Sequence, residues 1–465
     1  MTSSVAVVLA AGLGTRMKST LPKVLHQVAG WPMLKHISSA IRGAGVENII
    51  LVLGHQSELV EETMGDGYCV AYQKEQLGTG HALLQALPFL EEFQAGQCLV
   101  VCGDTPLLTA ETLKALREKQ QNCNAEAIIL TAEMADPTGY GRIVKKDGQV
   151  LRIVEEKDAG PEEKPIKEIN TGTYCFKIEG LKRLLPKLSP TNAQGEYYLT
   201  DIISLLAQEG KCVETHLLAD PNEAMGINNR VQLAEAEKLM RRRINEQHML
   251  AGVTMIDPEN TYIEAGVEIG QDTIIYPGVH LVGKTKIGSA CEIGPDCRIV
   301  DSAVAKGTLI KYSYLSEAEV GEHCTIGPYS YLRPGTVLAN KVKVGDFSEI
   351  KNSFIGEGSK IPHLSYIGDS SIGKGVNIGA GTITCNYDGV KKFPTYIGDG
   401  TFVGSNSNLV APLTVGAGAY IGAGSTVTKD IPAGALAVAR GRQRNIDNWR
   451  ERLTLKAGQD KQGED

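Results

Sequence analysis

The feature that most constrains this chain is an aliphatic residue that returns at every sixth position through the C-terminal third. The first run covers 263–299, the second covers 320–350 and the third covers 397–427. A period of six fits neither the 3.6-residue turn of an α-helix nor the two-residue alternation of a half-buried strand. The members are Ile263, Ile269, Ile275, Leu281, Ile287, Ile293 and Ile299, then Val320, Ile326, Leu332, Leu338, Val344 and Ile350, and finally Ile397, Val403, Leu409, Val415, Ile421 and Val427.

This hexapeptide period predicts a parallel β-helix. Three hexads complete one triangular coil, so each inward aliphatic side chain stacks on the one eighteen residues earlier. With coils about 4.8 Å apart, residues 263–427 would form about nine coils. An open coil exposes unpaired strand edges, so we expect the flanking segments to cover both ends of this prism.

Length and composition restrict the class of protein. A chain of 465 residues is too long for one core and predicts two or three domains. Its net charge of −7 argues against a nucleic-acid partner. There is no basic segment ahead of a leader-like apolar run and no stretch long enough to span a membrane, which together predict a cytoplasmic protein without membrane association. Ten cysteines without paired spacing indicate reduced thiols and argue against a zinc cluster.

The first 229 residues alternate short apolar strands with helical patterns. We expect strands at 5–9, 49–53 and 99–102 and helices at 33–44 and 109–121. This alternation predicts an α/β, Rossmann-like domain with a mostly parallel sheet, whose ligands lie at the carboxyl ends of the strands. Residues 230–250 then read as one connecting helix.

A glycine-containing loop, AAGLGTRMKS, follows the first strand. Backbone N–H groups in such a loop can face an anion, and Arg16 and Lys23 add positive charge. A tight strand-to-helix turn is the alternative, and the loop lacks the endings of a Walker A or dinucleotide fingerprint. The longer string LAAGLGTRMKSTLPKVL resembles the signature of sugar-1-phosphate nucleotidyltransferases.

A carboxylate stands where the strand in LVVCGDTPLL ends. Asp104 at that position suits Mg²⁺ beside nucleotide phosphates, and a helix cap after Pro106 is the alternative. The segments EQLGTGHA, TGYGRI, VEEKD, EINTG, GEYYLTD and GINNR follow in this order. Together with the prism, they are similar to bacterial bifunctional N-acetylglucosamine-1-phosphate uridyltransferases and glucosamine-1-phosphate acetyltransferases over residues 5–450.

The resemblance implies a nucleotidyltransferase domain at 1–229, a helical linker at 230–250, a left-handed β-helix acetyltransferase domain at 251–456 and a disordered tail at 457–465. In the first domain, UTP and N-acetylglucosamine-1-phosphate would bind. Gln73, Gly78 and Thr79 would contact uracil, Gly141, Glu155 and Asn170 would hold the sugar, and Asp104 with Asn228 would bind Mg²⁺. The residues implied are Leu9, Ala10, Ala11, Gly12, Arg16, Lys23, Gln73, Gly78, Thr79, Gly103, Asp104, Gly141, Glu155, Asn170 and Asn228.

Two positions in this domain depart from the family pattern. Leu13 stands where many members have a lysine, so Arg16, Lys23 and the metal would neutralise more of the triphosphate charge. Cys102 stands where relatives often have an aromatic residue. No histidine is required for this chemistry, because a sugar phosphate is largely dianionic at neutral pH, and His81 is expected to be structural.

In the prism, polar residues interrupt the regular pattern at three places: around Leu332, at 349–366, and in a loop between Thr384 and Ile397. The resemblance implies that His363 is the general base of acetyl transfer, a role that suits an imidazole, and Glu349 is a candidate to orient it. Glucosamine-1-phosphate would be bound by Arg333, Lys351, Tyr366 and Asn377, and acetyl-CoA by Ala380, Asn386, Tyr387, Ser405, Ala423 and Arg440.

We therefore expect two consecutive activities that supply UDP-N-acetylglucosamine for bacterial cell-wall precursors, in a chain that the family resemblance implies is a homotrimer. A single-activity nucleotidyltransferase with a scaffolding prism is the first alternative. A zinc enzyme built on the prism is the second, but the spacing of His280, His323 and His363 places no two of them within one coil.

Overall fold

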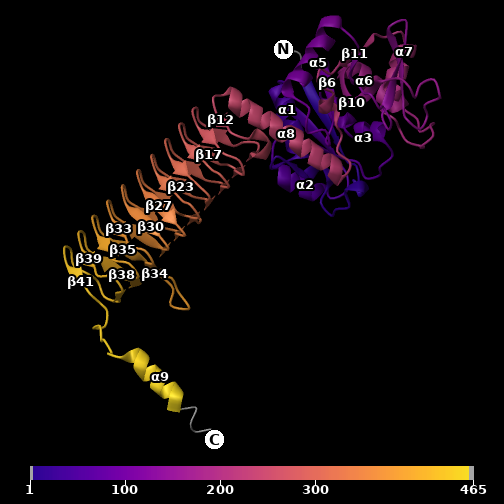
Figure 1. The fold of residues 1–465 in the computed structure, drawn as a ribbon. Helices are drawn as coiled ribbons and strands as arrows, with labels where there is room; N and C mark the ends of the chain where they lie inside the picture. Colours follow the sequence, from indigo (N-terminus) through magenta and orange to yellow (C-terminus); the bar gives the residue numbers. More distant parts are fainter. Residues whose placement is uncertain (1–3, 460–465) are drawn as a thin grey trace. The chain divides into compact units, whose positions relative to one another are not determined.

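The computed structural model describes residues 4–459, which form two compact units (Figure 1). The first comprises the chain up to 247 together with 263–265, and the second comprises 248–262 and everything from 266 onward. No helix in the described range is long and apolar enough to cross a membrane. All ten cysteines are free thiols.

The first unit is built on one sheet with the strand order β11-β7-β10-β6-β1-β4-β5. The central strand β1 pairs in parallel with β4 and β6, whereas β10 runs antiparallel to β6 and β7. The expected mostly parallel sheet is therefore confirmed, with antiparallel pairing at β10 and in the β8–β9 hairpin beside it. The strands are β1 (Ser4–Ala10), β4 (Asn48–Leu53), β5 (Cys69–Tyr72), β6 (Gln97–Cys102), β7 (Ala127–Glu133), β8 (Gly141–Lys146), β9 (Gln149–Val154), β10 (Glu168–Lys177) and β11 (Val213–Leu217), with a small hairpin of β2 (Gln27–Val28) and β3 (Trp31–Pro32).

Both faces of this sheet are covered. Alternate residues of β1 enter two separate hydrophobic clusters, Val5 and Val7 one of them and Ala6 and Val8 the other. This alternation explains why β1 is apolar at every position from Val5 to Ala10. The helices are α1 (Met33–Gly43), α2 (Ser57–Met64), α3 (Thr79–Gln85), α4 (Leu87–Leu90), α5 (Ala110–Cys123), α6 (Ile178–Leu184), α7 (Asp201–Gln208) and α8 (Arg230–Leu250), the last over the range expected for the connecting helix.

The second unit is a left-handed parallel β-helix whose three ladders contain 11, 10 and 9 strands. The first ladder is β12 (Thr254–Met255), β15 (Ile274–Ile275), β18 (Glu292–Ile293), β21 (Leu309–Ile310), β24 (Thr325–Ile326), β27 (Lys343–Asp346), β30 (Lys360–His363), β33 (Asn377–Ile378), β36 (Phe402–Val403), β39 (Tyr420–Ile421) and β41 (Leu436–Ala437). The second is β13 (Tyr262–Ile263), β16 (His280–Val282), β19 (Arg298–Val300), β22 (Tyr314–Ser316), β25 (Tyr331–Leu332), β28 (Glu349–Lys351), β31 (Tyr366–Gly368), β34 (Ile383–Cys385), β37 (Asn408–Val410) and β40 (Thr426–Val427). The third is β14 (Glu268–Ile269), β17 (Lys286–Ile287), β20 (Ala303–Val304), β23 (Glu319–Val320), β26 (Val337–Leu338), β29 (Phe354–Ile355), β32 (Ser370–Ile372), β35 (Thr395–Ile397) and β38 (Leu413–Val415).

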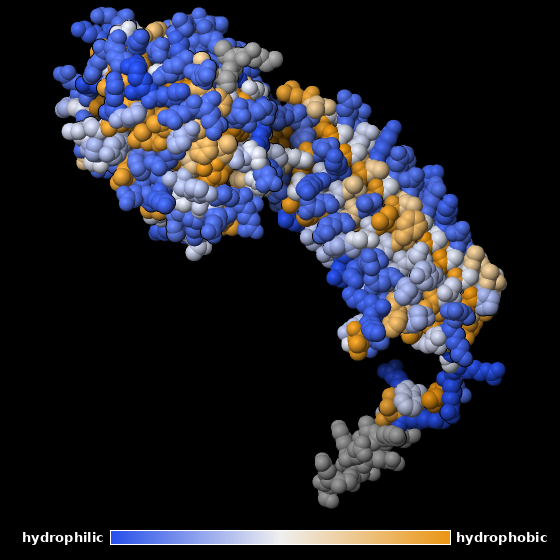
Figure 2. Space-filling model, turned by 180° about the vertical axis from the view of Figure 1, so that it is seen from behind, coloured by the Kyte–Doolittle hydropathy of each residue, from blue (hydrophilic) through white to orange (hydrophobic). Residues whose placement is uncertain are grey.

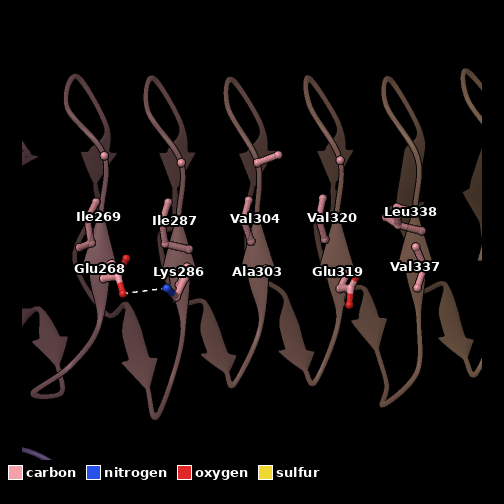
Figure 3. Close-up of a pocket in the computed structure, with 14 residues that line it drawn as sticks. Glu268, Ile269, Lys286, Ile287, Ala303, Val304, Glu319, Val320, Val337 and Leu338 are labelled. Atoms are coloured by element: carbon pink, nitrogen blue, oxygen red, sulfur yellow. Dashed lines mark ion pairs between the residues drawn. The ribbon is translucent and has the colours of Figure 1, made fainter.

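The register of these ladders confirms the hexapeptide reading. Ile269 pairs with Ile287, which is eighteen residues further on, and Figure 3 shows the two side chains side by side on adjacent coils. The next partners, Val304 and Val320, follow at shorter spacings of seventeen and sixteen residues. Because these coils have fewer than eighteen residues, the six-residue period is interrupted between the first and second aliphatic runs.

One outer face of the prism carries a furrow of about 590 Å³ over β14, β17, β20, β23 and β26 (Figure 3). Glycines line it because a Cβ on Gly270 would lie 2.5 Å from the backbone nitrogen of Ser289 in the next coil. An ion pair of 2.8 Å joins Glu268 and Lys286 across its first coils. None of the residues that line the furrow is among the predicted site residues, so we interpret it as a consequence of close coil packing.

Between β34 and β35 the chain leaves the prism in a long loop, as the thirteen-residue spacing predicted. An antiparallel bridge between Tyr387 and Lys392 closes this extruded loop, residues 386–394. After β41 the chain forms helix α9 (Trp449–Gln459), which includes residues 457–459 of the segment expected to be disordered. The remaining residues of that segment, 460–465, lie outside the described range.

Candidate active sites

The glycine loop after β1 places Lys23 at the carboxyl edge of the sheet. Gly14 adopts a left-handed conformation (φ 60°), and a Cβ there would lie 2.6 Å from the Cβ of Lys23. Only glycine lets the loop pass this close to Lys23. The predicted strand-to-loop geometry therefore also fixes the position of the lysine.

Four predicted residues meet beside this loop. The Lys23 ammonium donates to the carboxylate of Asp104 and, at 2.8 Å, to the Oδ1 of Asn228. Arg16 donates to the same Oδ1 at 2.9 Å. The backbone N–H of Ile227 donates to the Asp104 carbonyl at 2.9 Å, which holds the segment of Asn228 against the end of β6. Two cations and two oxygen ligands from distant parts of the sequence thus form one cluster.

A cavity of about 290 Å³ adjoins this cluster at the carboxyl ends of β1, β5 and β6. This is the edge at which an α/β sheet of this kind binds its ligands. Glu196 also lines it, although the sequence reading gave this residue no role. The predicted nucleotide residues that line the cavity are Leu9, Ala10, Ala11, Gly12, Lys23, Gln73, Gly78, Thr79 and Asp104.

The segment expected to contact uracil is held rigidly. The Nε2 of the buried Gln73 donates to the carbonyl of Gly78 at 3.1 Å and contacts the Nδ1 of His81 at 3.0 Å. The other ring nitrogen of His81 lies 3.2 Å from Gln85. His81 is therefore a hydrogen-bonding residue within the fold, as expected. Thr79 accepts from the backbone N–H of Leu199 at 3.2 Å, which joins the segment to GEYYLTD.

The three residues expected to hold the sugar also meet. A Cβ on Gly141 would lie 3.4 Å from the Glu155 carboxylate and 3.5 Å from the Cβ of Asn170. The amide of Asn170 donates to the hydroxyl of Tyr174 at 2.8 Å and accepts from the backbone of Gly172 at 3.1 Å. Hydrogen bonds therefore fix both the nitrogen and the oxygen of the Asn170 amide. Tyr174 positions this amide, and no sequence motif indicated that residue.

Burial raises the pKa of Glu155, and a hydrogen bond of 3.2 Å from the Thr200 hydroxyl partly offsets this. The protein therefore keeps a carboxylate in a poorly solvated position. Arg142 lies at the start of β8, next to Gly141. Its side chain is almost fully buried and pairs with Glu156 at 2.6 Å. Sequence reading missed this pair because an arginine after a glycine carries no signal of burial.

The two departures from the family pattern have different environments. The Leu13 side chain is exposed at the loop tip. The Cys102 thiol lies 3.6 Å from the Gly172 carbonyl, and burial and the Asp104 charge raise its pKa to about 12. This thiol lines the cavity but stays protonated, so we assign it no nucleophilic role.

In the prism, Arg333, Lys351 and Tyr366 lie on successive coils of one outer face. Arg333 directly follows β25, Lys351 ends β28 and Tyr366 begins β31. Arg333 donates to Glu349 at 2.7 Å. Lys351 lies 3.5 Å from the carboxylate of Asp369. Two cations predicted to bind a sugar phosphate thus face the same side of the β-helix.

His363 ends β30 and is exposed to solvent. Its Nδ1 lies 3.5 Å from the Oδ2 of Asp346, its ladder partner on β27. Asp346, and not the expected Glu349, lies beside the His363 imidazole within this chain, while the Glu349 carboxylate accepts from Arg333. The sequence gave no signal for Asp346, since its proximity depends on the register of two coils.

The corner that contains His363 continues as a ladder of predicted acetyl-CoA residues. The backbone of Gly381 donates to the His363 carbonyl, and that of Asn406 donates to the Ala380 carbonyl at 2.7 Å. On the next coils, the backbone of Gly424 donates to the Ser405 carbonyl and the Arg440 guanidinium donates to the Ala423 carbonyl, both at 2.8 Å. His363, Ala380, Ser405, Ala423 and Arg440 therefore follow one corner over about 19 Å, at about 4.8 Å per coil.

The other three predicted residues lie beside this corner. Asn377 is on β33, opposite Lys360. Tyr387 is exposed on the extruded loop, and Asn386 at the base of the loop is buried and donates to Asp369. The same loop brings in Lys392, which the sequence reading did not single out. A hydrogen bond to the Lys351 side chain, and the charge of that side chain, lower the pKa of Lys392.

No group of three or more His, Cys, Asp or Glu side chains within residues 4–459 is arranged to hold a metal ion. The three-histidine arrangement that a zinc enzyme on the prism would need is thus not found among the described residues. Mg²⁺, which accepts one or two protein oxygens together with substrate phosphates, has different requirements.

Three models of known protein families match separate segments of the chain. Residues 6–159 match the model of the MobA-like NTP transferase domain. Residues 257–348 match the GMPPB C-terminal domain, and residues 394–429 match the bacterial transferase hexapeptide with six repeats.

Curated relatives match along nearly the whole chain. The bifunctional protein GlmU of Carboxydothermus hydrogenoformans is 54% identical over 95% of this chain and 99% of its own length. The protein of the same name from Pelotomaculum thermopropionicum is 55% identical over 96% and 97%, and that of Clostridioides difficile is 50% identical over 98% and 99%. This chain therefore belongs to the family of bifunctional GlmU proteins.

Proposed function

We propose that the two clusters described above carry out the two activities of this bifunctional enzyme. The β-helix acetylates glucosamine-1-phosphate from acetyl-CoA. The α/β unit then transfers UMP from UTP to N-acetylglucosamine-1-phosphate, giving UDP-N-acetylglucosamine and pyrophosphate. The main observation behind the acetyltransferase assignment is that the predicted base, His363, and four predicted acetyl-CoA residues follow one corner of the β-helix up to Arg440. A prism that served only as a scaffold would not need these residues along one corner.

Uridyl transfer depends on charge and position. A phosphate oxygen of N-acetylglucosamine-1-phosphate attacks the α-phosphorus of UTP, the bond to the bridging oxygen breaks, and pyrophosphate leaves. No general base is needed, because the attacking phosphate is already largely deprotonated near neutral pH. Lys23 and Arg16 would neutralise charge on the phosphates, while Gly141, Glu155 and Asn170 would hold the sugar in line.

The oxygen atoms at this site fit Mg²⁺. Asp104 and Asn228 already direct a carboxylate and an amide oxygen at one cation, the Lys23 ammonium. Hard oxygen ligands of this kind are those that Mg²⁺ prefers. We propose that Asp104 and Asn228 hold the ion, which when bound supplies charge neutralisation at the nucleotide phosphates.

Acetyl transfer requires a base. The 2-amine of glucosamine-1-phosphate attacks the thioester carbonyl, and His363 takes a proton from this amine. The carbon–sulfur bond then breaks, and the departing coenzyme A thiolate takes up a proton to become the free thiol. Because the Nδ1 of His363 faces Asp346, its Nε2 is the nitrogen left for the substrate. Arg333, Lys351, Tyr366 and Asn377 would bind the sugar phosphate.

The remaining proposals concern assembly and location. Exposed aromatic rings follow one another along the prism: Tyr329 stacks on Phe347 at 5.5 Å and lies tilted against Tyr312 at 5.6 Å. In Figure 2, apolar residues also gather on the visible face of this unit. These surfaces support assembly of the chain into a homotrimer. Sedimentation of the intact protein would test this oligomeric state. We also propose that the enzyme acts in the cytoplasm.

Product analysis by mass spectrometry tests the proposed function. The purified chain is given glucosamine-1-phosphate, acetyl-CoA, UTP and Mg²⁺, and UDP-N-acetylglucosamine is the expected product. Omission of acetyl-CoA should stop its formation, and N-acetylglucosamine-1-phosphate should then restore it. A chain that uses N-acetylglucosamine-1-phosphate but never acetylates glucosamine-1-phosphate would favour the scaffold alternative.

Glu155→Gln should stabilise the α/β unit and weaken sugar binding. Burial raises the pKa of Glu155 in the folded state, so the folded chain binds this proton more tightly than the unfolded chain does. Stability of the wild type therefore falls as pH rises from the ordinary glutamate range through the raised value. The neutral glutamine avoids this loss.

Thermal melts from pH 4 to pH 8 measure the effect. The melting temperature of the variant should exceed that of the wild type increasingly as pH rises, by about 2–4 °C for each kcal/mol gained. The KM for N-acetylglucosamine-1-phosphate should rise while the KM for UTP stays close to wild type. A variant that is less stable at pH 8 would contradict the argument.

A further inference from the structure

Asp369 occupies an unusual position between the two halves of the acetyl-transfer site. It follows β31 at a coil corner in the left-handed conformation (φ 49°), and its side chain is only 13% exposed. Its Oδ1 accepts from Asn352 at 2.7 Å and lies 3.5 Å from the Lys351 ammonium. Its Oδ2 accepts from the amide of Asn386. One carboxylate therefore contacts three side chains from three different segments.

Two of these partners belong to different substrates in the proposed function. Lys351 is on the side of the sugar phosphate, whereas Asn386 is on the side of acetyl-CoA. Burial tends to raise the pKa of Asp369, but hydrogen bonds from Asn352 and Asn386 and the charge of Lys351 lower it overall. The residue is thus held as a carboxylate, the form that can accept from all three partners.

The neighbouring glycine brings the same two sides together. A Cβ on Gly368 would lie 2.5 Å from the hydroxyl of Tyr366 and 2.7 Å from the Nδ2 of Asn386. Tyr366 is predicted to bind the acceptor and Asn386 the donor. Both side chains therefore occupy the space that a side chain at position 368 would fill.

Asp369 also holds the extruded loop at its two ends. Its carboxylate accepts from Asn386, where the chain leaves the coil, and its carbonyl accepts from the backbone of Thr395 at 3.2 Å, where the chain returns. The loop carries Lys392 to the side of Lys351. The position of that second ammonium thus depends on the same corner.

We propose that Asp369 is a positioning residue for acetyl transfer, which holds the acceptor-side Lys351 and the donor-side Asn386 in one arrangement above Gly368. The inference rests on the proposed function of the β-helix. It predicts that loss of the carboxylate disturbs the binding of both substrates together, because one side chain fixes both contacts. A residue that only stabilised the coil would change the melting temperature and leave both KM values as they are.

The test is Asp369→Asn, which keeps the size of the side chain and suits the left-handed conformation. In steady-state acetyl transfer, the KM for glucosamine-1-phosphate and the KM for acetyl-CoA should each rise by about tenfold or more, a loss typical of one charged hydrogen bond. Uridyl transfer by the same preparation should be unchanged. Asp369→Glu should restore part of both losses, because it returns the charge.

Asp301→Asn is the matched control. Asp301 is also a left-handed corner residue (φ 45°), and its carboxylate accepts from the backbone of Lys284 at 2.8 Å. It contacts none of the residues assigned to substrates. Both KM values should therefore stay at the wild-type level. If Asp369→Asn fails to fold, Gly368→Ala provides the second variant, since its methyl group would displace Tyr366 and Asn386 and raise the same two constants.

A rise in only one of the two KM values, or wild-type values for both, would overturn the inference. A wild-type chain that does not acetylate glucosamine-1-phosphate would instead reject the proposed function, and the inference with it. Wild-type acetylation together with normal kinetics in Asp369→Asn and Gly368→Ala would reject the inference alone.

Discussion

His363→Ala should lower the rate of acetyl transfer by about 10²–10⁴-fold, the contribution of a well-placed general base. The amine of the acceptor must lose a proton as it attacks the thioester, and His363 stands at the end of the corner ladder where the acetyl group is expected. Its exposed imidazole has Asp346 on the Nδ1 side. The substitution removes the base without changing the buried column of the β-helix, so the variant should fold.

The reaction products identify where the variant stops. With glucosamine-1-phosphate, acetyl-CoA, UTP and Mg²⁺, His363→Ala should leave the sugar phosphate unacetylated, yet it should convert added N-acetylglucosamine-1-phosphate at the wild-type rate. His280→Ala is a control in the same unit, because His280 stacks on Tyr262 at 4.4 Å and has no assigned role. Acetylation at the wild-type rate by His363→Ala would rule out this residue as the base.

Asp104→Asn should lower uridyl transfer at least about a hundredfold, since charge stabilisation by a bound metal is worth several kcal/mol. The carboxylate faces both the Lys23 ammonium and the proposed Mg²⁺ position. Asparagine retains an oxygen atom but not the charge. The reaction should stop at N-acetylglucosamine-1-phosphate, with acetyl transfer unaffected.

The dependence on Mg²⁺ separates two roles of this carboxylate. If Asp104 is a ligand, the Mg²⁺ concentration for half-maximal activity should rise in Asp104→Asn, and excess Mg²⁺ should restore part of the rate. If it only orients Lys23, the rate should fall without any change in that concentration. Asp147→Asn, at the turn after β8, is the control for an aspartate of the same unit outside the site.

The sequence was sufficient to predict the elements whose side chains repeat. The aliphatic column, the extruded loop and helix α8 follow from spacing alone, because each coil or turn must bury the same positions. The nucleotide cluster was also predictable in outline. Gly12, Asp104 and Asn228 follow strands or lie in motifs whose residues tend to meet at one edge of a parallel sheet.

Contacts between coils could not be predicted in the same way. Asp346 beside His363, and Asp369 beside Lys351 and Asn386, depend on coils of sixteen to eighteen residues, and one residue of drift changes the partner. This drift explains why the sequence indicated Glu349 and gave no signal for Asp346 beside His363. Arg142 was missed for another reason, since the burial of a charged side chain depends on a carboxylate from a later loop.

The stacking of equivalent coils has a consequence for the evolution of this enzyme. Each coil contacts essentially the coil before it and the coil after it, as the ladders of paired strands illustrate. A gene duplication or deletion that spans one whole coil would therefore join surfaces that already match. The length of the β-helix can change in such steps, whereas the single sheet of the α/β unit offers no equivalent place to add or remove a segment.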